Sequence, residues 1–207
     1  MAPPRTPARV RVSNSNRVFD GYLKVDRYEL SHELYCGNWS QTLVREVMDR
    51  GEVAAVLPFD PVCQEVVLIE QFRVGAWAAN WQEPWLLECV AGVMHEGESA
   101  GEVAIREARE ETGCEVTDLE LVYRYFSSSG ACSELVDLFC GRVDASTVDG
   151  IHGLADEGED IYARAWPLAD ALALLDTGRI CNSVTLIALQ WLALNHQRLT
   201  SEWLRRS

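Results

Sequence analysis

The sequence predicts a mixed β-sheet sandwiched by helices, an α/β or α+β fold with an N-terminal antiparallel sheet as an extension. Three observations predict it. Short apolar runs bounded by turn residues recur along the chain, one helical segment ends at a glycine, and an alternating segment precedes the first apolar run. The 207 residues are 48% hydrophobic and 24% charged, which suits one domain or two small ones and excludes disorder of the whole chain.

The N-terminal part is expected to hold a tail and a small sheet. Residues 1–17 contain three prolines and no apolar period, so they are predicted to be a mobile tail. Over residues 18–52 apolar and polar positions alternate, most clearly in Tyr22–Val25 and Thr42–Met48, which predicts strands of a β domain. Residues 53–207 are then expected to form the second domain.

The second domain is predicted to begin with a β-hairpin, because the apolar runs Val53–Leu57 and Val66–Ile69 are separated by the turn-like FDPVCQ. Another core strand is expected over Trp85–Val90. A Gly-rich turn leads into a helix that ends at Thr112, with Gly113 in the position after a helix that favours glycine. Further strands are predicted at Leu119–Phe126, Leu135–Val143 and Ile161–Trp166, and helices at Leu168–Leu175 and Asn182–His196.

The composition excludes several classes of partner. The formal net charge of −14 argues against general binding of nucleic acid or of an anionic membrane, since both need basic surface. The longest apolar stretches are too short to span a bilayer, and the N-terminus lacks the apolar core of a signal peptide. The seven cysteines form no CxxC pair, which fits buried thiols in a reducing compartment. We therefore expect a cytoplasmic protein.

The negative charge is concentrated in two short segments. Residues 95–115 carry a net charge of −5 and residues 153–160 a net charge of −4, so these two segments hold nine of the fourteen net negative charges. A solvated acidic surface is the usual meaning of such a run. The local pattern has to decide between that meaning and a cation site.

Three glutamates in the first segment share one helix face. Glu107, Glu110 and Glu111 are spaced i, i+3 and i+4, so their carboxylates project together and repel one another. Carboxylate oxygen is the ligand type that Mg²⁺ and Mn²⁺ prefer. For the three glutamates alone, a solvated acidic helix face is the favoured interpretation.

The residues around the three glutamates favour a cation site instead. From Gly92 the chain gives glycine, five residues, Glu98, seven residues, Arg106-Glu107, an apolar residue, and then REETG followed by an apolar residue. Seven fixed positions arise by chance on the order of 10⁻⁹ per starting point. This pattern resembles a complete Nudix box. Arg106 is expected to orient the glutamates through ion pairs.

The resemblance extends over about residues 19–200 and is closest to the bacterial ADP-ribose pyrophosphatase branch of the Nudix family. It rests on the stretches VLPFDPVCQEVVLIEQFRVGAW, EPWLLECVAGV, GIHGLADEGEDI and VTLIALQWLALNHQ. It implies Mg²⁺-dependent hydrolysis of ADP-ribose to AMP and ribose 5-phosphate, with Mn²⁺ as a substitute cation. It also implies a homodimer that exchanges its N-terminal sheet domain, so that each active site borrows residues from the partner.

The resemblance assigns roles residue by residue. Glu157, in the second acidic segment, would be the base that activates water. The metal ligands would be the Ala91 carbonyl, Glu107, Glu111 and Glu159, with Glu110 assisting. Substrate contacts within one subunit would come from Arg50, Arg73, Val93 and the loop Ser128–Glu134, and those from the partner would come from Tyr22, Leu23, Arg45 and Glu46.

Some assignments keep a second interpretation. Arg73 ends an apolar strand and could be a surface residue, although phosphate contact is favoured. Tyr22 is as well explained by core packing as by stacking on adenine. Members specific for ADP-ribose carry a proline where this chain has Ser129, so hydrolysis of another nucleoside diphosphate sugar stays open. A non-catalytic domain that senses ADP-ribose is a further alternative, although the glutamate set is complete here.

Overall fold

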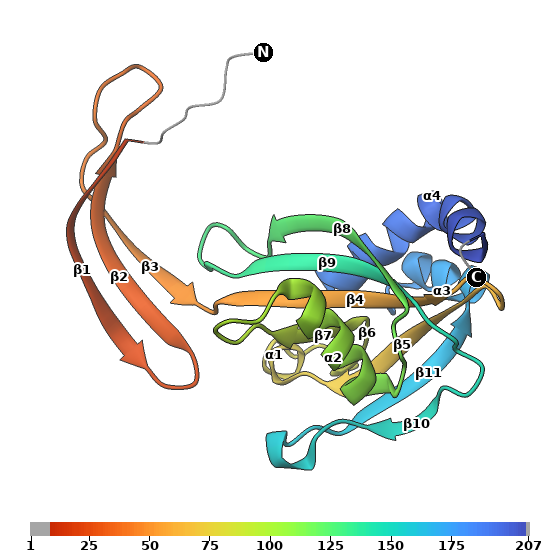
Figure 1. Cartoon of the computed structure of the whole chain (residues 1–207). Coiled ribbons are helices and arrows are strands. Elements are labelled where there is room, and N and C mark those ends of the chain that lie inside the picture. The colour runs from red at the N-terminus through yellow and green to blue at the C-terminus, as the bar shows by residue number, and fades with distance from the viewer. Residues whose placement is uncertain (1–8, 206–207) are drawn as a thin grey trace. The chain divides into compact units, whose positions relative to one another are not determined.

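The computed structural model describes residues 9–205, apart from the side chain of Glu157. The chain divides into two compact units (Figure 1). The first runs to Gly51 and includes the loop Phe126–Glu134. The second comprises Glu52–Tyr125 and the chain from Leu135 onward. Over the described residues, no helix is both long enough and apolar enough to cross a membrane.

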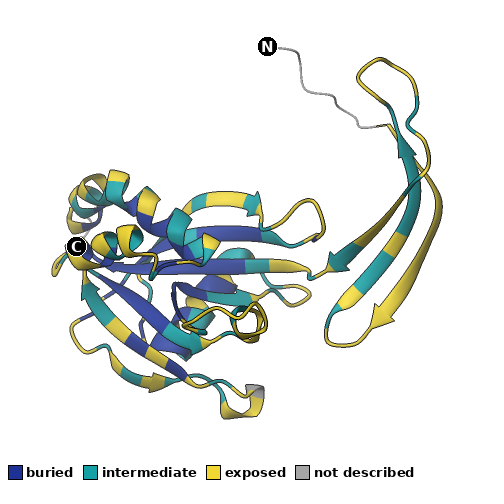
Figure 2. Ribbon diagram, turned by 180° about the vertical axis from the view of Figure 1, so that it is seen from behind, coloured by how far each residue is buried: buried dark blue, intermediate teal, exposed yellow. Residues whose placement is uncertain are grey.

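The first unit contains a three-stranded antiparallel sheet in the order β1-β2-β3. Its strands are β1 (Val10–Asp20), β2 (Lys24–His32) and β3 (Leu43–Asp49). β1 is exposed along its whole length (Figure 2).

The predicted tail is wrong for residues 10–17, because they belong to β1, while residues 1–8 lie outside the described residues. β1 is held by its ladder with β2 and by ion pairs instead of by burial. Arg17 binds Asp26 through two hydrogen bonds of 2.8 Å, one from Nε and one from a terminal nitrogen, and this pairing lowers the pKa of Asp26.

The loop Phe126–Glu134 is hydrogen-bonded to β3 within the first unit. The Met48 amide donates to the Ala131 carbonyl at 2.8 Å, and the Ser133 amide donates to the Met48 carbonyl at 3.0 Å. Arg50 also forms an ion pair with Glu134 at 3.3 Å. This loop therefore extends the small sheet, although it follows a strand of the second unit in sequence.

The second unit contains an eight-stranded mixed sheet. Its main path is β10-β11-β5-β4-β9-β8, with β6 paired to β5 and β7 paired to β4. β4 and β9 pair in parallel. The strands are β4 (Glu52–Asp60), β5 (Glu65–Phe72), β6 (Trp85–Glu88), β7 (Val90–Val93), β8 (Asp118–Phe126), β9 (Leu135–Arg142), β10 (Asp149–His152) and β11 (Ile161–Pro167).

The predicted hairpin of β4 and β5 is confirmed, and its two strands separate away from their turn. β4 and β5 pair only next to their turn, at Phe59 with Val66 and Asp60 with Glu65. Beyond that point β4 pairs with β7 over Val53–Val56, and β5 pairs with β6 over Ile69–Phe72. The junction of β6 and β7 therefore lies where the two long strands have separated.

Helices cover both faces of the sheet (Figure 1). Alternate residues of β4 point to opposite faces. Ala54 and Val56 pack in a cluster with α2, whereas Leu57 and Phe59 pack in a cluster with α3 and α4. The predicted sheet between helices is confirmed. The helices are α1 (Val74–Ala78), α2 (Ala100–Thr112), α3 (Leu168–Ala173) and α4 (Ser183–Leu204), and short 3-10 turns are η1 (Ala155–Glu157) and η2 (Leu174–Thr177).

Two helix ends differ from the prediction. α4 continues to Leu204 instead of ending at His196, because Leu199 and Trp203 keep its buried face against the sheet through a polar stretch of sequence. α3 ends at Ala173, and the chain then tightens into η2.

Candidate active site

Helix α2 carries the site, and both of its ends are fixed by local interactions. The Ser99 side chain accepts the Glu102 amide, while the Glu102 carboxylate accepts the Ser99 amide at 2.9 Å, which is a capping box. Gly113 ends the helix with a φ of 72°, a conformation that favours glycine. These caps fix where the glutamate face of the helix lies.

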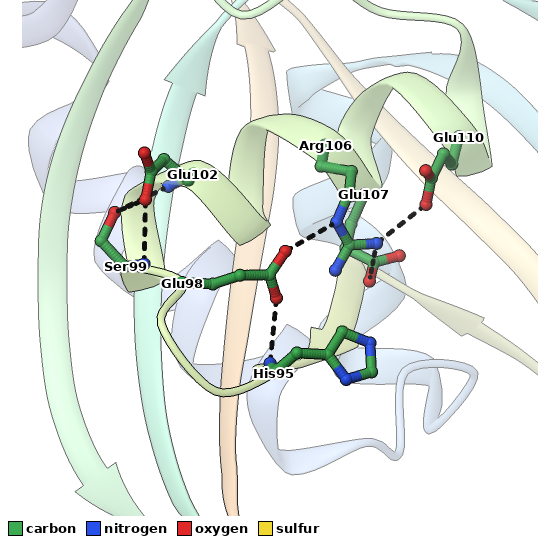
Figure 3. Close-up of polar contacts among 7 residues, drawn as sticks. All are labelled: His95, Glu98, Ser99, Glu102, Arg106, Glu107 and Glu110. Atoms are coloured by element: carbon green, nitrogen blue, oxygen red, sulfur yellow. Dashed lines mark hydrogen bonds and ion pairs between the residues drawn. The ribbon is translucent and has the colours of Figure 1, made fainter.

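The loop before α2 is tied to the helix by Glu98 (Figure 3). One oxygen of its carboxylate accepts the His95 amide at 2.9 Å, and the other lies 3.4 Å from Nε of Arg106. The amide, more than the guanidinium, lowers the pKa of Glu98. Arg106 also donates to Glu107 and Glu110, both at 2.9 Å, and these are the ion pairs that the sequence predicted.

Glu107 lies directly over the backbone of Gly92. A β-carbon built on Gly92 would be 1.7 Å from Oε1 of Glu107, so only glycine leaves room for this side chain. Burial raises the pKa of Glu107, Arg106 opposes that rise, and Glu110 and Glu159 add to it. The carboxylate is thus held close to the backbone at the end of β7.

Glu111 is the most deeply buried acid of the helix, at 2% exposure. Its carboxylate accepts the Ala91 amide at 3.3 Å. Burial, and then the negative charges of Glu107 and Glu159, raise its pKa well above 4.5, while Arg73 opposes the rise. Glu107 and Glu159 therefore lie close enough to Glu111 to affect its pKa.

The fit of these residues to a metal ion depends on their donor chemistry. Among residues 9–205, no three acidic, histidine or cysteine side chains already converge in a geometry that would hold a metal ion. The donors are nevertheless all oxygens, and burial raises the pKa of both Glu107 and Glu111 above the ordinary value of a glutamate. A hard divalent cation fits this donor set.

The second acidic segment reaches the cluster through Glu159. The Leu154 amide donates to the Glu159 carboxylate at 3.1 Å, and the Gly153 amide donates to the Glu110 carbonyl at 3.4 Å. Gly153 has a φ of 97°, and a β-carbon there would be 2.7 Å from Cβ of Glu159. Glu157 ends η1, and its side chain lies outside the described residues.

Arg73 follows β5 and forms an ion pair with Glu88 on β6. Its Nε and one terminal nitrogen contact the same oxygen of Glu88 at 2.7 and 2.6 Å, and Asn182 donates to the other Glu88 oxygen at 2.7 Å. The sequence predicts a phosphate contact for Arg73 but gives no role to its partner Glu88 or to Asn182. A carboxylate inside the apolar run WLLECV was the available signal.

The remaining predicted substrate residues divide between the two units. Val93 ends β7 and is exposed, at 43%. Tyr22, in the turn between β1 and β2, is 92% exposed, which rules out core packing within this subunit. Arg45 and Glu46 are exposed on β3, opposite Tyr28 and Arg27. The first unit contains Tyr22, Leu23, Arg45, Glu46, Arg50, Ser128 and Glu134, and the second contains Arg73, Ala91, Val93, Glu107, Glu110, Glu111 and Glu159.

Comparison with known proteins agrees with the fold and the glutamate helix. The NUDIX domain model matches residues 48–184, and the chain belongs to the Nudix family. Among its relatives, the ADP-ribose pyrophosphatase of Escherichia coli K12 is 44% identical over 194 residues, which cover 94% of this chain and 92% of that protein. A GDP-mannose pyrophosphatase of Escherichia coli strain UTI89 is 36% identical over 154 residues, which cover 73% and 78%.

A solved structure shares the fold. The crystal structure of an ADP compounds hydrolase superposes with a TM-score of 0.71 at 22% identity, covering 95% of this chain and 98% of that one.

Proposed function

We propose that this chain hydrolyses the diphosphate of ADP-ribose to AMP and ribose 5-phosphate with the help of Mg²⁺. The observation that carries the proposal is the placement of two glutamates of α2 on adjacent residues of β7: the buried Glu111 carboxylate accepts the Ala91 amide, and the Glu107 carboxylate lies over Gly92. The similarity to ADP-ribose pyrophosphatases over nearly the whole chain supports the choice of substrate.

The metal would be held by the Ala91 carbonyl and by Glu107, Glu111 and Glu159, with Glu110 assisting. A bound divalent cation neutralises phosphate charge and lowers the pKa of a bound water. Arg106 keeps Glu107 and Glu110 in place, and Gly92 and Gly153 leave room for Glu107 and Glu159. Glu157 would take the proton of the attacking water, since its loop also carries Glu159.

Within one subunit, Arg73 would bind the diphosphate. The other contacts from the same subunit would come from Arg50, Val93 and the loop Ser128–Glu134. The ion pair of Arg50 with Glu134 supports a joint role for these residues, because it links the loop to the end of β3.

Residues 18–52 would form the exchanged domain of a homodimer, with Tyr22, Leu23, Arg45 and Glu46 reaching the partner's site. The character of the first sheet supports this arrangement. No hydrophobic cluster found among the described residues includes a side chain of β1, β2 or β3. Three strands without a core of their own gain stability by packing against another surface.

Another nucleoside diphosphate sugar is the main alternative substrate. Ser129 replaces the proline of ADP-ribose-specific members, and the chain is also similar to a GDP-mannose pyrophosphatase. The greater identity and coverage of the ADP-ribose pyrophosphatases favour ADP-ribose. A sensing domain without catalysis is disfavoured because the described glutamates of the box are all present.

The test is a substrate panel in H₂¹⁸O with Mg²⁺, in which products are identified by mass spectrometry. We expect AMP and ribose 5-phosphate from ADP-ribose at the highest kcat/KM of the panel. GMP from GDP-mannose as the dominant product would overturn the choice of substrate. Binding of ADP-ribose without AMP release would establish the sensor instead, and the position of the label identifies the phosphorus attacked.

A further inference from the structure

A carboxylate lies inside the apolar strand β6 and is almost completely removed from solvent. Glu88 is 3% exposed, between the buried residues Leu87 and Cys89. Burying a charge costs several kcal/mol unless partners compensate it, and an apolar residue in such a position usually serves stability as well or better. Glu88 therefore calls for an explanation beyond the stability of the core.

Both oxygens of Glu88 have specific partners. One accepts from Nε and a terminal nitrogen of Arg73, at 2.7 and 2.6 Å. The other accepts from the Asn182 side-chain amide at 2.7 Å. The carboxylate is thus fully hydrogen-bonded and bridges the end of β5 to the start of α4.

The start of α4 holds this carboxylate in a rigid frame. Asn182 is the N-cap of α4, because its side-chain oxygen accepts the Thr185 amide at 3.2 Å. The Thr185 hydroxyl in turn accepts the Cys89 amide at 2.9 Å. Glu88 and Cys89 are therefore anchored side by side, and a helix N-terminus also favours a nearby negative charge.

Arg73 is bound to this frame and is also open to solvent. Its side chain is 40% exposed, whereas that of Glu88 is 4% exposed. Three residues beyond Glu88, the Ala91 amide donates to the Glu111 carboxylate at 3.3 Å, so the partner of Arg73 and a proposed metal ligand lie on one short stretch of chain. Within the described part of the chain the remaining terminal nitrogen, Nη1, has no hydrogen-bond partner in the structure, and it is available to an anion.

We propose that Glu88, held by Asn182, is a positioning residue that fixes the Arg73 guanidinium for the diphosphate of the substrate. The inference rests on the proposed function, since Arg73 must bind that diphosphate. Glu88 holds two guanidinium nitrogens, and the third would donate to the diphosphate. The paired carboxylate also offsets the charge of Arg73, so that the arginine supplies directed hydrogen bonds more than net charge.

A double-mutant cycle tests the inference, with steady-state kinetics of the wild type, Glu88→Gln, Arg73→Ala and the double variant. Glu88→Gln should raise KM by roughly 10- to 100-fold, as expected for loss of a charged hydrogen bond, with a smaller change in kcat. In the Arg73→Ala background the same substitution should change KM by less than about twofold. Equal effects in the two backgrounds, or no effect of Glu88→Gln, would overturn the proposal.

Two further variants separate positioning from folding. Asn182→Ser keeps a good N-cap for α4 but removes the amide that holds Glu88, so it should raise KM in the same direction as Glu88→Gln. Glu70→Gln is the matched control, because Glu70 on β5 also binds an arginine, Arg179, at 2.5 Å. Glu70→Gln should leave KM unchanged. A rise in KM equal to that of Glu88→Gln would show a general structural effect and overturn the proposal.

Failure of the proposed function is distinguishable from failure of this inference. The cycle uses whichever nucleoside diphosphate sugar the wild-type protein hydrolyses best, so a wrong choice of substrate leaves the test intact. If the wild type binds ADP-ribose without hydrolysing it, the same double-mutant cycle uses the Kd for ADP-ribose, measured by calorimetry, in place of KM. A wild-type protein that neither hydrolyses nor binds any sugar of the panel would overturn both proposals.

Discussion

Oε1 of Glu107 occupies the space that a side chain at position 92 would need, 1.7 Å from an ideal β-carbon. The glycine of the box is therefore required by a neighbour on α2, and its own φ is not in the left-handed region. Glu107 packs against β7, the strand that contains Ala91. The position of the Glu107 carboxylate is therefore fixed relative to the Ala91 carbonyl, and both groups are proposed metal ligands.

Replacing Gly92 with alanine is expected to displace Glu107. We expect Gly92→Ala to weaken activation by Mg²⁺ by about 10- to 100-fold, the range found when the support of a metal ligand is removed. Titration of activity against Mg²⁺ measures this. Gly75→Ala is the control, because a β-carbon at Gly75 would meet nothing within 4 Å. Equal Mg²⁺ activation of Gly92→Ala and wild type would contradict the role given to this contact.

The buried Glu111 predicts a specific dependence of stability on pH. Its pKa is raised well above 4.5 in the folded protein. At pH values between 4.5 and that raised pKa, the folded state therefore binds more protons than the unfolded state. The free energy of unfolding of metal-free protein should therefore fall as pH rises through that interval. Glu111→Gln should lack this fall.

Urea unfolding of the two proteins at a series of pH values above 4.5 measures the difference. Saturating Mg²⁺ should reverse the fall in the wild type, since a cation bound by the folded state alone stabilises it. Parallel pH curves for wild type and Glu111→Gln, without metal, would show that Glu111 is not the group responsible.

Glu157 and Glu159 are predicted to have separable roles. Glu157→Gln should lower kcat by about 10²- to 10⁴-fold, the usual contribution of a general base, while the affinity for Mn²⁺ stays the same. Glu159→Gln should instead raise the Mn²⁺ concentration needed for half-maximal activity. Asp156→Asn, an exposed neighbour in η1, is the control. Unchanged turnover in Glu157→Gln would assign the base to another group.

The capping box of α2 should contribute to stability more than to catalysis. Ser99→Ala removes the side chain that accepts the Glu102 amide and should cost about 1 kcal/mol, which lowers Tm by roughly 2–4 °C. Ser99→Thr keeps the cap and should restore most of the loss. Calorimetry measures both. A Tm of Ser99→Ala equal to that of wild type would mean that the cap is dispensable.

Local signals made α2 predictable from sequence. The glycine that ends it and the spacing of its three glutamates lie within about 20 residues of one another in the chain. The core strands were equally clear, because β4 and β5 are continuous apolar runs. In these segments the residue types themselves indicate which secondary structure forms.

Long-range interactions made other features unpredictable. β1 is polar and exposed, and it is a strand because β2 pairs with it and because Arg17 binds Asp26. Glu88 is stabilised by Asn182, which lies 94 positions away in the chain. Neither relationship leaves a periodic pattern in the sequence, so a single sequence could not reveal them.

The hydrogen bonds between Met48 and the loop after β8 have a consequence for truncation and for domain shuffling. Met48 exchanges backbone hydrogen bonds with Ala131 and Ser133, so the loop loses its template if the chain is cut at the boundary before Glu52. The N-terminal sheet is therefore not a detachable module. A recombination event that replaced the sheet would have to replace the loop Phe126–Glu134 as well, although the two segments are far apart in the gene.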